Sequence, residues 1–106
     1  MSIRPWHRPD RLSPNIVSVM EASNLSNHTI SRALNALGAS TVPSTLSRWR
    51  RGITRPDDLR PFAAWSGISE LTLAYATATA IDAAIATAKA GGRMVAAQAE
   101  GRAAAL

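Results

Sequence analysis

A short segment with a marked beginning and a marked end limits the folds open to this chain. Residues 43–52 read Pro-Ser-Thr-Leu-Ser-Arg-Trp-Arg-Arg-Gly. Proline is favoured at the first position of a helix and glycine just beyond the last, so the segment is predicted to be a short helix. Leu46 and Trp49 lie three residues apart and share a face that can pack on a core. Short hydroxyl side chains and arginines remain on the outer faces, where they can approach a surface closely.

The remainder of the pattern is also helical. Apolar residues recur at three- and four-residue steps and end at helix-stop signals, and no part of the chain alternates with the two-residue period of a strand. Further helices are expected over residues 13–24, 28–37, 57–66 and 69–90. The sequence therefore predicts an all-α fold, a compact bundle of four to five helices with an Ala-rich helix at the C-terminal end.

Positive charge is concentrated in the first sixty residues, which carry nine arginines against four acids, whereas the remaining residues carry three basic and three acidic side chains. The net charge of +5 therefore lies with the segment 43–52, as a polyanionic partner requires. The absence of cysteine excludes disulfides and thiolate metal sites. No apolar run reaches the ~18 residues of a membrane span, and a cytoplasmic protein is expected.

Residues 1–12 contain Arg4, Arg8 and Arg11 and two prolines, without helical or strand periodicity. One interpretation is a basic arm that follows phosphates or enters a minor groove. The alternative is a loosely ordered terminus whose Trp6 and Leu12 pack on the domain.

The chain from Ser69 onward is rich in alanine, which makes up fifteen of the last 38 residues. The apolar stripe of this segment consists mainly of small side chains, which permit close approach of a second helix. A homodimer is therefore expected. The candidate dimer interface comprises Leu71, Tyr75, Ala78, Ile81 and Ile85. The alternative is that this helix caps the core of a single chain.

Residues 26–69 resemble the lambda-repressor-like (Cro/C1-type, XRE) helix-turn-helix family. The resemblance lies in Ser-Arg-Trp-Arg-Arg-Gly at 47–52, Arg-Pro at 55–56, the apolar helix after residue 58 and Gly-Ile-Ser at 67–69. The resemblance implies that the helix over residues 43–51 binds in the major groove of DNA. By matching positions, base contacts fall on Ser44, Thr45, Ser47 and Arg48, and backbone contacts on Ser40, Thr41, Arg50, Arg51 and Arg55. Seven residues separate Gly38 from Leu46, a longer turn than is usual in the family.

The predicted function is a sequence-specific DNA-binding transcriptional regulator, of the phage repressor or Cro kind, that represses as a dimer by covering a short inverted repeat of double-stranded DNA. Residues 1–12 would be its arm, 13–68 its helix-turn-helix domain and 69–106 its dimerisation region and tail.

Three alternatives stay open. The first is a DNA-loading assembly protein such as a small terminase-like subunit. The second is an antitoxin that represses its own operon and binds a protein partner through its C-terminal helices, and the third is a module that binds an acidic protein. An enzyme is not expected, because the chain has no nucleophile–base constellation or phosphate loop. No cofactor or metal is expected either, since His28 has no partner cluster.

Overall fold

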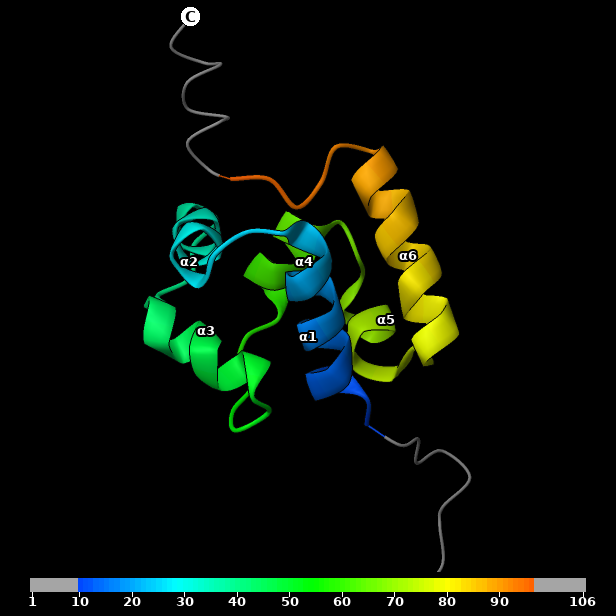
Figure 1. The fold of residues 1–106 in the computed structure, drawn as a ribbon, viewed down its shortest axis with the longest axis horizontal. Helices are drawn as coiled ribbons and strands as arrows, with labels where there is room; N and C mark the ends of the chain where they lie inside the picture. Colours follow the sequence, from blue (N-terminus) through cyan, green and yellow to red (C-terminus); the bar gives the residue numbers. More distant parts are fainter. Residues whose placement is uncertain (1–9, 97–106) are drawn as a thin grey trace, which may run out of the picture.

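The computed structural model describes residues 10–96, and all regular structure in that range is helical (Figure 1). The helices are, in chain order, α1 Leu12–Ser23, α2 Asn27–Ala36, α3 Pro43–Arg50, α4 Arg60–Ser66, α5 Glu70–Tyr75 and α6 Ala78–Ala90. The predicted all-α fold is confirmed. Within these residues, none of the helices has the length and apolar character needed to cross a membrane.

Helix α1 lies at the centre of the fold. It packs against α3 on one side and against α5 and α6 on the other, while α2 packs against α3 and α4 (Figure 1). One hydrophobic core joins the six helices, and its most deeply buried apolar side chains are Ile16, Val19, Met20, Ile30, Leu34, Leu46, Phe62, Leu73 and Ile81. The Ala-rich part of the chain therefore shares its core with the part that carries α3.

Three aromatic side chains connect α3 to α4 inside this core. The ring centroids of Trp49 and Phe62 lie 6.3 Å apart, and those of Phe62 and Trp65 lie 5.4 Å apart. Both pairs meet edge to face, an arrangement that aromatic rings prefer. Trp65 also donates from Nε1 to the carbonyl oxygen of Val95 at 3.0 Å. The cluster thus fixes α3 relative to α4 and holds the chain that follows α6.

The Ala-rich segment forms two helices instead of the single helix expected over residues 69–90. Helix α5 ends at Tyr75, and Ala76 is extended. Thr77 then caps α6 by accepting a hydrogen bond from the N–H of Ala80 at 3.1 Å. Alanine favours a continuous helix, but a threonine oxygen that caps a new helix stabilises the break.

A buried polar side chain on α1 holds the C-terminal end of α5. Asn15 has no exposed surface, and its Nδ2 donates to the carbonyl oxygens of Leu73 at 2.9 Å and Ala76 at 3.0 Å. The last carbonyl groups of a helix have no partner within it. Asn15 satisfies two carbonyl groups at this end, and so joins α1 to α5.

Two helices begin at positions other than those expected. Helix α4 begins at Arg60 and not at Asp57, because Pro61 has no N–H to donate to the Asp57 carbonyl, as the earlier start requires. Helix α1 begins at Leu12, whose N–H donates to the Asp10 carboxylate at 2.8 Å. Since Leu12 is buried, the helical domain includes the end of the segment expected to be an arm.

Candidate nucleic-acid interface

Helix α3 is anchored in the core by Leu46, which is fully buried, and Trp49, which is 6% exposed. Pro43 lies in its first turn, where the missing N–H removes no helical bond. Gly52 follows the helix with a φ of +73°, and its N–H donates to the carbonyl oxygen of Trp49 at 3.0 Å. Glycine adopts this left-handed conformation at little cost. The predicted helix and its buried face are confirmed.

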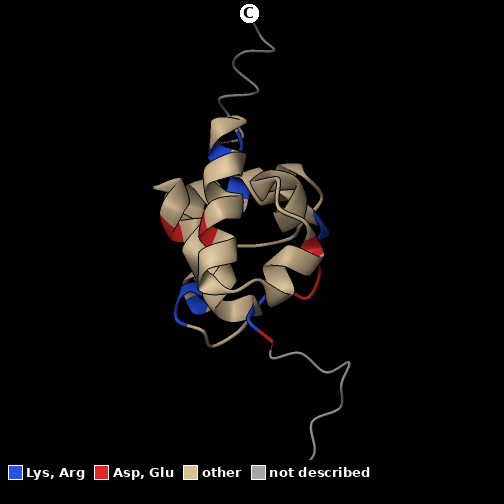
Figure 2. Ribbon diagram, turned by 90° about the vertical axis from the view of Figure 1, so that its right-hand side faces the viewer, with Lys and Arg blue, Asp and Glu red and all other residues tan. Residues whose placement is uncertain are grey.

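The outer side of α3 is exposed to solvent, and we define it as Ser44, Arg48 and Arg51, the residue that directly follows the helix. Thr45 and Ser47 are half-buried. Within residues 10–96, neither the side chain of Arg48 nor that of Arg51 has a hydrogen-bond or ion-pair partner. Arg48 and Arg51 lie close to Arg50 in the sequence, so the end of α3 and the residue after it are drawn largely in blue in Figure 2. An unpaired guanidinium keeps five N–H donors for an external acceptor.

Arg50 belongs instead to the inner side of α3, which we define as Leu46, Trp49 and Arg50. Its guanidinium forms an ion pair with the Glu21 carboxylate of α1. It also donates from Nε to Asn27 Oδ1 at 2.6 Å and from Nη2 to the Leu25 carbonyl oxygen at 3.0 Å. These bonds hold α3 against the α1–α2 turn, and the predicted contact of Arg50 with the DNA backbone stays a prediction.

Arg55 is intermediate between the side chains of Arg48 and Arg51, which are free among residues 10–96, and the bound side chain of Arg50. It forms an ion pair with Asp10, yet half of its side chain is exposed, so it lies at the surface with part of its donor capacity unused. The Leu12 N–H and, next in effect, the Arg55 guanidinium hold the pKa of Asp10 below its usual range. The pair fastens the chain ahead of α1 to the loop that follows α3.

The turn between α2 and α3 is closed by polar bonds that involve Thr41. Its N–H donates to Asn35 Oδ1 at 2.8 Å, its carbonyl oxygen accepts from Asn35 Nδ2 at 2.9 Å, and its hydroxyl lies 2.8 Å from the Ser31 hydroxyl. Its N–H and hydroxyl are therefore both engaged within the protein, and the predicted backbone contact by Thr41 stays a prediction. Ser40 beside it is exposed, as its predicted contact with the DNA backbone requires.

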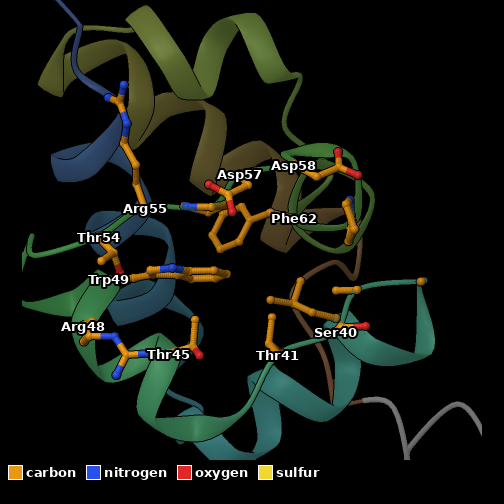
Figure 3. Close-up of a pocket in the computed structure, with 15 residues that line it drawn as sticks. Ser40, Thr41, Thr45, Arg48, Trp49, Thr54, Arg55, Asp57, Asp58 and Phe62 are labelled. Carbon is orange, nitrogen blue, oxygen red and sulfur yellow. The ribbon is translucent and has the colours of Figure 1, made fainter.

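A hollow of about 440 Å³ lies between this turn, α3, the loop of residues 54–58 and the start of α4 (Figure 3). We call it the α3 hollow. Five residues predicted to contact DNA line it, namely Ser40, Thr41, Thr45, Arg48 and Arg55. Thr54, Asp57 and Asp58 also line it and were not predicted. The long spacing from Gly38 to Leu46 was a signal of an unusual turn on this side of α3.

The candidate dimer interface divides into exposed and buried residues. Leu71 is 64% exposed and Tyr75 is 39% exposed, one turn apart on α5, and Ala78 is exposed at the start of α6. Ile81 and Ile85 are buried in the core of the single chain. These two isoleucines pack on the core beneath α6, and their predicted role in a dimer interface stays a prediction.

The predicted N-terminal arm is only partly described. Arg4 and Arg8 lie outside the described residues. Arg11 donates from Nε to the Ala76 carbonyl oxygen at 3.0 Å, and its N–H donates to the Ala74 carbonyl oxygen at 2.8 Å. These bonds fasten the start of α1 to the end of α5, and the arm function predicted for Arg11 stays a prediction.

Within residues 10–96, no three histidine, aspartate or glutamate side chains come together in a group able to hold a metal ion. Comparison of the chain with protein-family models, with curated proteins and with solved structures gives no match.

Proposed function

We propose that this protein binds double-stranded DNA through the outer side of α3 and acts as a sequence-specific transcriptional regulator. The observation that carries the proposal is the unpaired state of Arg48 and Arg51 among the described residues, on a helix whose other side is fixed in the core. A helix presented in this way can enter a major groove, where arginine donates two hydrogen bonds to guanine O6 and N7.

The proposed DNA contacts fall into two groups, contacts to bases and contacts to phosphates. Ser44 and Arg48 face base edges, with Thr45 and Ser47 able to contribute hydroxyl groups from half-buried positions. Ser40, Arg51 and Arg55 flank them and face phosphates. Base contacts select a sequence, whereas phosphate contacts position the protein. Arg50 and Thr41 are excluded from this set because their polar groups bind within the protein.

A dimer is part of the proposal. Leu71 and Tyr75 form an exposed apolar patch on α5, extended by Ala78. A homodimer paired through this patch can place two copies of α3 on one face of DNA, with half-sites about one helical turn apart. It represses by covering an operator against polymerase, in the cytoplasm of a bacterial or phage-infected cell.

The experiment that tests the proposal selects bound duplexes from a random pool with the purified full chain, and then measures the mass of the complex on the selected sequence. The expected result is a short inverted repeat bound by two protein chains. A sequence-independent pool bound by a larger ring supports the assembly protein instead. An absence of salt-sensitive DNA binding contradicts the proposal outright.

A matched pair of variants connects the result to α3. Arg48→Ala removes one positive charge from the outer side and is expected to weaken binding to the selected repeat. Lys89→Gln removes one positive charge from α6, on the far side of α1 from α3 (Figure 1), together with a hydrogen bond from Lys89 Nζ to the Ala22 carbonyl oxygen at 2.6 Å. It is expected to leave DNA binding nearly unchanged. Equal losses in both variants mean that net charge, and not α3, governs binding.

A further inference from the structure

Two neighbouring aspartates in the loop before α4 have different surroundings. Asp58 Oδ1 accepts a hydrogen bond from the Arg60 N–H at 3.0 Å, and Asp58 Oδ2 accepts one from Arg60 Nη2 at 2.9 Å. The Arg60 guanidinium holds the pKa of Asp58 below its usual range. Asp57, by contrast, is exposed and has no hydrogen-bond or ion-pair partner in the described part of the chain. Asp57 therefore has free acceptor capacity.

Asp57 also lines the same hollow as Arg48. Figure 3 shows it on one side of the α3 hollow, with Arg48 and Thr45 on the other side and the rings of Trp49 and Phe62 between them. Both Trp49 and Phe62 are almost fully buried, so the polar groups of the hollow project from a rigid base. A duplex docked against the outer side of α3 meets donors from Arg48 and acceptors from Asp57 at the same hollow.

The chemistry of a carboxylate limits what Asp57 can bind there. An ionised carboxylate only accepts hydrogen bonds, and DNA phosphates repel it. The donors in the major groove are the exocyclic amino groups, N4 of cytosine and N6 of adenine. Adenine presents the acceptor N7 beside N6, which opposes the second carboxylate oxygen. Cytosine has no acceptor on this edge, and so it is the better partner for aspartate.

We propose that Asp57 is a specificity-determining residue, which selects a cytosine at or next to the base pair that Arg48 reads. This inference rests on the proposed function. Arg48 takes the guanine acceptors and Asp57 takes a cytosine amino group, so the two side chains together specify a G·C-containing step. Asp58 cannot share this role, because Arg60 occupies its oxygens.

The test repeats the duplex selection with the full chain carrying Asp57→Ala, Asp57→Asn or Asp58→Ala. Wild-type protein is expected to prefer cytosine at one position of each half-site by about tenfold. Asp57→Ala removes that preference and leaves the others. Asp57→Asn shifts the same position toward adenine, since asparagine pairs with adenine N6 and N7. Asp58→Ala removes an equal charge and raises affinity for all duplexes alike.

The outcomes distinguish a failure of the role proposed for Asp57 from a failure of the proposed sequence-specific DNA binding. If Asp57→Ala raises affinity for every duplex by the same factor, with unchanged base preferences, Asp57 is only a repulsive charge and the inference is overturned while sequence-specific binding stands. If the wild-type chain selects no preferred sequence, the proposed function fails and the inference fails with it. Circular dichroism of each variant confirms that the helical fold is retained.

Discussion

Arginine occurs on both sides of α3, but its surroundings differ between the two sides. On the inner side, Leu46 and Trp49 are buried and Arg50 is bound to the α1–α2 turn. On the outer side, the side chains of Arg48 and Arg51 have no hydrogen-bond or ion-pair partner among the described residues. Arg50 and Arg51 are adjacent in the chain, yet the guanidinium of Arg50 is bound within the fold and, within residues 10–96, that of Arg51 is free. The role of an arginine here depends on which partners the fold brings to it.

The largest expected effect lies on the inner side of the helix. Trp49→Ala is expected to lower the free energy of unfolding by about 3–5 kcal/mol, because it removes a buried aromatic side chain and leaves a cavity. Denaturant unfolding followed by circular dichroism measures this change. Ser44→Ala, on the outer side of the same helix, serves as the control and is expected to alter stability by less than about 0.5 kcal/mol. Similar losses in the two variants break the distinction between the sides.

Arg50→Ala sharpens the comparison between the two neighbouring arginines. It is expected to cost about 1–3 kcal/mol of stability, because hydrogen bonds to the Leu25 carbonyl and the Asn27 side chain are lost. Arg50→Lys restores only part of this loss, since an ammonium lacks the planar fork of a guanidinium. The control is Arg51→Ala, for which an unchanged denaturation midpoint is expected.

Arg48→Ala tests the outer side directly. It is expected to weaken binding to the selected duplex by about 1–3 kcal/mol and to relax specificity at one base position, since a bidentate contact with guanine is lost. Titration of duplexes that differ only at that position measures the effect. Equal weakening on every duplex instead assigns Arg48 to the phosphates. The stability of the variant is expected to match that of the wild type.

The smallest expected effect concerns Asp10, which pairs with the intermediate Arg55. The Leu12 N–H and, next in effect, the Arg55 guanidinium lower the pKa of Asp10 in the folded chain from an ordinary value of 3.8. These contacts therefore stabilise the fold above that pH and lose their contribution as the pH falls further. For an exposed pair this contribution is less than about 1 kcal/mol. Unfolding of wild type and Asp10→Asn is compared from neutral to acid pH. The wild type is expected to lose its small advantage on acidification, and a constant difference contradicts this account.

Local signals predicted α3 well. The signals that predict this helix all lie within ten residues of sequence, namely Pro43, Gly52 and the spacing of Leu46 and Trp49. Helix caps and helix faces depend on such short-range geometry. The all-α fold follows from the same kind of signal. The outer side of α3 was therefore visible in the sequence, although the Asp57 side of the hollow was not.

The remaining features depend on contacts between distant parts of the chain. Nothing near Arg50 in the sequence shows that α1 brings Glu21 to it, and nothing near Ile81 shows that the core covers it. The break before α6 depends on Thr77, whose side chain caps a helix inside an alanine-rich stripe that otherwise favours continuity. The amide of Asn15 was overlooked for the same reason, since its acceptors lie on α5.

The salt dependence of DNA affinity tests the central claim most directly, when it is measured for wild type, Arg51→Ala and Arg50→Ala on the selected duplex. We expect Arg51→Ala to lower the slope of log affinity against log salt by about one, because one phosphate contact and its released counterions are lost. Under conditions where it is folded, Arg50→Ala is expected to keep the wild-type slope. A reduced slope in Arg50→Ala together with an unchanged slope in Arg51→Ala contradicts the assignment of the two sides of α3.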